Sequence, residues 1–158
     1  MTLSTAYLNK TQLKIWSLRR TGYKQADIAR ELRITRQAVN KTVGAIDENI
    51  QFAMNELAAL NDIAPRYMST IEGIMIGHSR RFDVDVVVTL SDTSNLQIWY
   101  SHTADCDVCK SYDFCRSFLM SEAKRRNVEL SKDEKKLQPA RIAKILFAKL
   151  GADFGGMK

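Results

Sequence analysis

The segment at residues 25–41, QADIARELRITRQAVNK, constrains the fold of this chain more than any other stretch. Apolar residues recur there at helical spacing and predict a helix over residues 25–32. Thr35 is suited to cap a second helix, because its hydroxyl can accept a hydrogen bond from a free amide of the first turn. Ala38 and Val39 are then expected to face the core. Two helices joined by so short a turn predict a helix-turn-helix.

The outer face of the second predicted helix carries side chains that suit DNA. Arginine contacts guanine, and glutamine and asparagine contact adenine, so Arg36, Gln37 and Asn40 are candidates for base readout. Lys41 is better suited to a phosphate. The expected DNA-contacting residues are Lys24, Arg33, Thr35, Arg36, Gln37, Asn40 and Lys41. An ordinary helical hairpin with a basic outer face is the alternative interpretation.

Positive charge is concentrated in the same part of the chain. The net charge of the 158 residues is +6, and residues 1–45 hold nine Lys and Arg against two acidic residues, which is +7. The remaining residues therefore sum to −1. This distribution is expected for a head that binds a polyanion such as double-stranded DNA, attached to a body with little net charge.

The phrase DIARELRITRQAVNK resembles the helix-turn-helix of many prokaryotic regulators, including sigma-factor region-four-like proteins and Tfx-type archaeal regulators. Those proteins usually have glycine where this chain has Arg33. Glycine tolerates a positive φ that is sterically unfavourable for arginine, so the departure allows for a differently shaped turn. Dimers suit this class, because two heads on a twofold axis read a palindrome, and we expect a homodimer.

Beyond the head, the patterns predict an α+β fold with a long connecting helix and a small antiparallel three-stranded sheet with C-terminal helices. The long helix continues from the recognition helix until Pro65, with an apolar stripe at Ile46, Ile50, Met54, Leu57 and Leu60. This stripe fits either a core helix of the same chain or a dimer helix. The predicted strands, rich in β-branched and aromatic residues, are 73–79, 83–91 and 96–102. Helices are expected at about 117–126 and after Pro139.

These elements divide the chain into three predicted parts. They are a helix-turn-helix DNA-binding domain at 1–45, a connecting or dimerisation helix at 46–66, and a small α+β domain with a Cys-rich metal site at 67–158. No apolar run is long enough to span a bilayer, and the N-terminus lacks the apolar segment of a signal peptide. We therefore expect a cytoplasmic protein with no membrane partner.

All three cysteines lie in the segment CDVCKSYDFC, with the spacing C-x2-C-x5-C, and one of the two histidines precedes the first of them by four residues. Thiols so close together in a cytoplasmic protein are not expected to form structural disulfides. A Cys pair three residues apart turns two thiolates toward one metal ion. The candidate metal ligands are His102, Cys106, Cys109 and Cys115. Free buried thiols, clustered by chance, are the alternative.

A zinc ion with Cys3His ligands would need nothing outside residues 102–115. The segment also resembles the C-x2-C-x5-C segments of SPASM-type radical enzymes and CRISPR-associated exonucleases, which hold a four-iron, four-sulfur (4Fe-4S) cluster. That resemblance implies an iron–sulfur cluster here, with His102 as the fourth ligand. We favour the cluster and keep zinc as the alternative.

The chain as a whole resembles an archaeal Tfx-like regulator with a Cys-rich C-terminal domain. The expected function is a dimeric transcription regulator whose iron–sulfur cluster acts as a redox or metal sensor, or alternatively one with a purely structural zinc site. An enzyme that uses the cluster and is tethered to DNA is the least favoured hypothesis. The sequence has no Ser/His/Asp set and no phosphate loop, and the pair Asp83 and Asp85 is expected on a solvated strand face.

Overall fold

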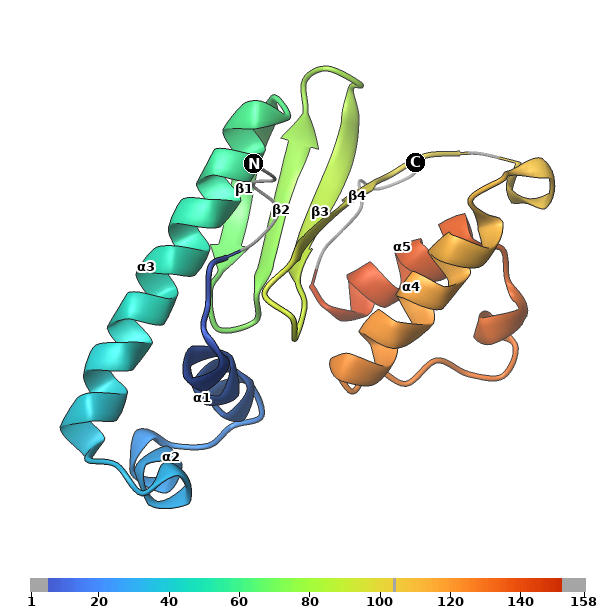
Figure 1. Cartoon of the computed structure of the whole chain (residues 1–158). Coiled ribbons are helices and arrows are strands. Elements are labelled where there is room, and N and C mark those ends of the chain that lie inside the picture. Colours follow the sequence, from blue (N-terminus) through green and yellow to red (C-terminus); the bar gives the residue numbers. More distant parts are fainter. Residues whose placement is uncertain (1–5, 104, 152–158) are drawn as a thin grey trace. The chain divides into compact units, whose positions relative to one another are not determined.

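The chain divides into two compact units, residues 1–99 and 100–158. A computed structural model describes residues 6–103 and 105–151 (Figure 1). Helices are combined with an antiparallel sheet, which confirms the mixed helix-and-sheet class. One helix, over residues 36–60, runs without a break across residue 45, and the strands up to residue 90 lie in the first unit.

Three helices form the head of the first unit: α1 (Lys10–Arg20), α2 (Gln25–Leu32) and α3 (Arg36–Leu60). α1 begins after Asn9, whose side chain accepts a hydrogen bond from the Gln12 N–H at 2.8 Å. The Gln12 side chain accepts in return from the Asn9 N–H at 3.0 Å. This reciprocal capping box satisfies two backbone amides that the helix leaves without internal partners.

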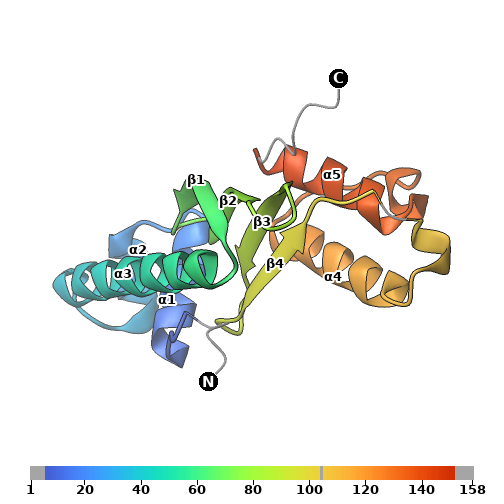
Figure 2. The same ribbon diagram turned by 90° about the horizontal axis from the view of Figure 1, so that it is seen from above.

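α3 is the long helix that the apolar stripe predicted, and it turns that stripe toward its own unit. Ile46, Ile50 and Met54 are fully buried, whereas Leu60 at the helix end is 62% exposed. α3 packs against α1, α2 and β1 (Figures 1 and 2). The stripe therefore belongs to the core of the chain, which favours the core-helix interpretation over the dimer-helix one.

The sheet has four strands in the order β1-β2-β3-β4, where three were predicted. They are β1 (Ile63–Ser69), β2 (Ile74–Ser79), β3 (Val84–Leu90) and β4 (Leu96–Tyr100). The missed strand is β1, which contains the proline that was expected to end the long helix. The register of β1 on β2 shifts between Pro65 and Tyr67. Proline has no amide to donate, so an edge strand with an irregularity is where a sheet tolerates it.

Trp16 of α1 connects the helical head to the sheet. Its side chain is fully buried, and its Nε1–H donates to the carbonyl oxygen of Thr70 at 2.9 Å, just beyond β1. Gly73 lies against the indole with a φ of +60°. A Cβ at this position would come within 2.6 Å of Trp16 Cζ2 and 2.9 Å of Leu90 Cβ. The indole can pack here only because residue 73 has no side chain.

We predict that Gly73→Ala destabilises the first unit by about 2 kcal/mol, since it combines a positive φ with overpacking against the indole. The matched control is Gly44→Ala in the interior of α3, where a Cβ would meet no atom within 4 Å. That change is expected to stabilise α3 by about 0.5–1 kcal/mol, because alanine is the better helix former. Urea unfolding of both variants provides the measurement, and equal shifts of the two midpoints would contradict the packing argument.

The described residues of the second unit, 100–103 and 105–151, form two packed helices and two short 3-10 turns. The elements are η1 (Cys106–Val108), α4 (Tyr112–Arg125), η2 (Glu134–Lys136) and α5 (Pro139–Lys149). α4 begins earlier than the predicted start near residue 117, so Cys115 lies in its first turn. α5 begins at the predicted proline, and its apolar face is buried. Over the described ranges, no helix is both long and apolar enough to cross a lipid bilayer.

Candidate nucleic-acid interface and cysteine segment

The seven predicted DNA-contacting residues all have exposed side chains. They lie at the start of α2, in the turn between α2 and α3, and on the first turns of α3. Val39 is fully buried beneath them, as expected. Ala38 is exposed, contrary to the prediction, because successive residues on a helix are rotated by about 100° and only one of this pair can face the core.

The turn between α2 and α3 has the left-handed conformation that glycine usually provides. Arg33 has φ +54° and ψ +43°, and the N–H of the next residue, Ile34, donates to the carbonyl oxygen of Ala29 at 3.0 Å. Thr35 Oγ1 then accepts from the Ala38 N–H at 3.1 Å and caps α3, as predicted. The departure from glycine has therefore not reshaped this turn, and Arg33 bears the steric strain instead.

We predict that Arg33→Gly stabilises the first unit by up to about 1 kcal/mol, because relief of the left-handed strain exceeds the entropy that glycine loses on folding. Arg30→Gly is the matched control, since position 30 lies within α2. Glycine there should cost about 1 kcal/mol. Thermal unfolding of the two variants should shift in opposite directions, and a loss of stability in both would show that Arg33 is not strained.

A shallow hollow of about 380 Å³ lies where α2 meets the start of α3, and it is lined by Gln25, Arg36, Gln37 and Asn40. The Gln25 side-chain amide donates from Nε2 to Asn40 Oδ1 at 3.2 Å. This bond orients the Asn40 amide before any ligand arrives, so Gln25 is a positioning residue for the predicted base reader. Sequence analysis missed Gln25, because the pairing depends on how two helices cross and no local pattern encodes it.

Other basic side chains of the head hold the scaffold together and do not belong to this surface. Arg19 of α1 makes a bidentate pair with Asp47 of α3, at 2.7 and 3.1 Å. The guanidinium of Arg20 stacks over the Trp16 ring, 4.8 Å from its centroid, and pairs with Asp92 at 3.4 Å. Arg19 and Arg20 therefore contribute to the structure of the first unit and are engaged away from the predicted DNA-contacting surface.

The three cysteines lie in or near the short turn η1 and the first turn of α4. Cys106 is buried, Cys109 is exposed and Cys115 is intermediate. The Cys109 N–H donates to the Cys106 carbonyl oxygen at 3.2 Å, which closes the short turn η1. Burial raises the pKa of the Cys115 thiol above its ordinary value, and the nearby Cys109 and Cys106 raise it further. The three cysteines thus lie on two neighbouring local elements, η1 and α4, which contact each other.

The fourth predicted ligand lies in a different local setting. His102 Nδ1–H donates to the carbonyl oxygen of Tyr100 at 2.9 Å, and the imidazole lines a hollow with residues of α5. Within the described residues, no three His, Cys, Asp or Glu side chains are grouped so that they could hold a metal ion. The thiols provide a donor set whose chemistry fits a soft metal, but the predicted set of three Cys and His102 is not preassembled.

Asp83 and Asp85, the carboxylate pair considered for catalysis, surround a histidine instead. Asp85 Oδ1 lies 3.1 Å from His78 Nδ1, and Asp83 Oδ1 lies 3.1 Å from His78 Nε2. Arg66 pairs with Asp85 at 3.0 Å. Both carboxylates thus lie within hydrogen-bond distance of the His78 ring, and Asp85 also pairs with Arg66 on β1, so the two carboxylates are part of the polar surface of the sheet.

The chain matches no known protein family, and no characterised protein or solved structure shows significant similarity to it. The Tfx-like resemblance therefore stays a prediction. Function has to be argued from the geometry of the two candidate sites.

Proposed function

We propose that this chain is a DNA-binding transcription regulator whose recognition helix is the first part of α3. The observation that carries the proposal is the hollow lined by Gln25, Arg36, Gln37 and Asn40. It offers one guanidinium and two amides at the exposed start of the capped helix α3, and a third amide from the start of α2. Guanidinium and amide groups are the side chains that read base edges in the major groove. We place the side chains of three basic residues on backbone phosphates of the DNA: Lys24, Arg33 and Lys41.

The test begins with selection of preferred sequences from a random pool of DNA duplexes, followed by titration of the selected duplex. Gln37→Ala is expected to lose about 1–3 kcal/mol of discrimination, which is roughly 5- to 150-fold in affinity for the preferred site. Gln51→Ala is the control, because Gln51 is exposed on the same helix beyond the proposed contact region. Failure to enrich any sequence, or equal behaviour of the two variants, would overturn the proposal.

A homodimer remains part of this proposal, although the apolar stripe of α3 does not provide its interface. Two heads on one twofold axis would read a palindromic site. Sedimentation equilibrium of the protein with and without the selected duplex tests this. The proposal expects two copies on one duplex and a selected sequence with inverted-repeat symmetry.

We further propose that the three thiols hold a metal centre, as an iron–sulfur cluster that reports redox state or, alternatively, as structural zinc. The supporting observation is that Cys106 begins the short turn η1, Cys109 directly follows it, and Cys115 lies in the first turn of α4, which contacts η1. Thiolates in such a group suit zinc and iron–sulfur clusters. Either metal group, when bound, would hold residues 106–115 in one conformation. An iron–sulfur cluster would in addition be able to change its redox state. His102 would have to approach the thiols to serve as fourth ligand.

Anaerobic purification followed by a visible spectrum and by iron, sulfide and zinc analysis separates these alternatives. Broad visible absorbance with iron and sulfide supports the cluster, and a colourless protein with one zinc per chain supports the structural site. Cys106→Ser should abolish either signal. A protein that contains neither metal after anaerobic purification, and that takes up neither on reconstitution, would leave the thiols as free cysteines and end this proposal.

A further inference from the structure

A tight turn closes the end of α4 and sets the path of the chain that follows. The Val128 N–H donates to the carbonyl oxygen of Ala123 at 2.9 Å, and the Asn127 N–H donates to that of Lys124 at 3.2 Å. Asn127 has the left-handed φ of +53°. These two hydrogen bonds with one left-handed residue form a Schellman motif, which ends a helix in a defined direction. We call the chain that leaves this motif, residues 128–136, the return segment.

The return segment is fastened to both helices of the second unit. Arg116 of α4 donates from Nη2 to the carbonyl oxygen of Lys135 at 2.5 Å. Lys149 of α5 donates from Nζ to the carbonyl oxygen of Glu129 at 2.9 Å, and its ammonium group pairs with Glu134 at 2.9 Å. These contacts hold the return segment beside α4 before any ligand arrives, so a site between them would be preorganised.

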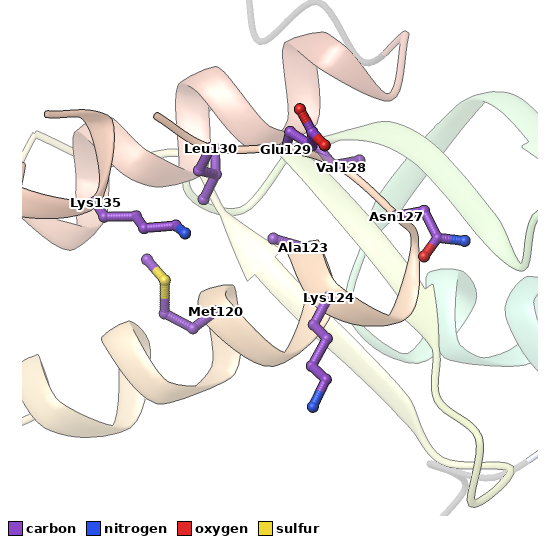
Figure 3. A pocket seen from close by; sticks show the side chains of 8 residues that line it. All are labelled: Met120, Ala123, Lys124, Asn127, Val128, Glu129, Leu130 and Lys135. Atoms are coloured by element: carbon purple, nitrogen blue, oxygen red, sulfur yellow. The ribbon is translucent and has the colours of Figure 1, made fainter. Parts of the chain in front are cut away.

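A hollow of about 660 Å³ lies between α4 and the return segment (Figure 3). Its apolar lining consists of Met120 and Ala123 of α4 and Val128 and Leu130 of the return segment. Ala123 and Leu130 are buried, which makes them the floor of the hollow. Small-molecule sites are commonly hollows of about 300–1,000 Å³ with largely apolar walls and a few polar groups. The size and lining of this hollow therefore suit a small organic molecule.

The charged side chains of the hollow differ in direction. Figure 3 shows the Lys135 side chain extending in the direction of Met120, whereas the Lys124 side chain extends away from the other lining residues. The Glu129 carboxylate is directed away from both Met120 and Lys135. The ammonium group of Lys135 is thus the charged group that faces the apolar lining.

The acidic residues that precede Lys135 in the chain are engaged with other lysines. Glu134 pairs with Lys149, and Asp133 pairs with Lys136 at 3.2 Å. Among the described residues, the ammonium group of Lys135 forms no hydrogen bond or ion pair. A lysine can lay its methylene chain along an apolar surface and present its charge at the end, where it attracts an anion.

We infer that this hollow binds a small organic carboxylate with an apolar body. The carboxylate pairs with Lys135, and the body packs on the apolar lining. A monoanion is favoured over a phosphate group, because a single cation faces the lining and Glu129 also lines the hollow. All residues of this site belong to the second unit, so the inference does not depend on the proposed DNA contact or on the metal centre.

The test uses octanoate as the probe and the full chain without DNA. Binding is followed by NMR of the protein labelled with ¹³C in its methionine methyl groups. The Met120 signal, assigned through Met120→Leu, should shift saturably with octanoate, whereas the signals of Met54 and Met75, which are fully buried in the first unit, should not. Hexanoate should bind more weakly, by up to about fourfold for each methylene that it lacks. Octylammonium, which has the same apolar body and the opposite charge, should bind far more weakly.

Lys135→Gln should weaken octanoate binding by about two- to fivefold, the range that an exposed ion pair contributes, and should leave the affinity for 1-octanol unchanged. Lys124→Gln is the matched control, because it removes the same charge from the same hollow at a side chain that extends away from the lining. Circular dichroism confirms that both variants are folded.

A saturable shift of the Met120 signal that is weakened by Lys135→Gln alone would support the inference. It is overturned if millimolar octanoate leaves the Met120 signal unchanged, or if octylammonium binds as tightly as octanoate. An equal loss of affinity in the two lysine variants would also overturn it, because the charge effect would then not come from a carboxylate paired with Lys135. Since no DNA is present, each of these outcomes leaves the proposed function to its own test.

Discussion

Trp16→Ala is expected to destabilise the first unit by about 3–5 kcal/mol, a large part of the 5–15 kcal/mol that usually stabilises a domain. The indole is fully buried between the head and the sheet, and Gly73 leaves room for it. Its removal creates a cavity, leaves the Thr70 carbonyl oxygen without the bond that it accepts from Nε1–H, and removes the ring on which Arg20 stacks. The head and the sheet should therefore separate more readily, and DNA affinity should fall with the folded fraction.

Urea unfolding followed by the fluorescence of Trp99 measures this loss. Trp99 is the only other tryptophan in the chain, it is 7% exposed, and it belongs to the first unit. Tyr23→Ala serves as the control, because the Tyr23 ring is 47% exposed and its removal leaves no cavity. A midpoint that shifts no further for Trp16→Ala than for Tyr23→Ala would show that the indole does not join the head to the sheet.

Local patterns were sufficient to predict the helices α2 and α3 and most of the sheet. The spacing of apolar residues located α2 and α3, and β-branched runs located β2, β3 and β4. β1 was missed because the segment IAPRYMS has no clear alternation and contains Pro65, which was interpreted as the end of the preceding helix. An edge strand is half exposed, and it forms backbone hydrogen bonds to a neighbouring strand on one side only. The run of buried β-branched residues that identifies an inner strand is therefore weak in such a segment.

The candidate sites show a similar limit. Arg36, Gln37 and Asn40 were identified because exposure on one helix follows from periodicity alone. The Gln25–Asn40 bond joins residues of two different helices, and its formation depends on their crossing. His102 was grouped with Cys106 on sequence proximity, yet the imidazole lies beside α5 residues. Proximity in sequence predicts a shared site only where the intervening backbone forms one turn, as it does between Cys106 and Cys109.

Glu122→Leu is expected to destabilise the second unit by about 3–5 kcal/mol, because it removes the carboxylate that compensates two guanidinium groups in a buried position. Glu122 is 1% exposed, and its two oxygens accept from Arg125 at 2.6 Å and from Arg126 at 2.8 Å. The Arg126 side chain is itself only 2% exposed, so water cannot readily replace the Glu122 carboxylate as its partner. Arg125 is 27% exposed and can be hydrated more easily.

Amide hydrogen exchange, resolved by peptide, measures the effect within each unit. Exchange in α4 and α5 should accelerate by on the order of a hundredfold or more, since each 1.4 kcal/mol corresponds to about tenfold, while α1–α3 should be unaffected. Addition of Arg126→Met to Glu122→Leu should restore much of the protection, because an apolar pair of similar volume replaces a buried guanidinium that has lost the Glu122 carboxylate. Glu129→Leu, at an exposed position, is the control. If the single and double variants exchange at the same rate, the cost does not come from an uncompensated Arg126, and the ion pair is not what holds α4 in place.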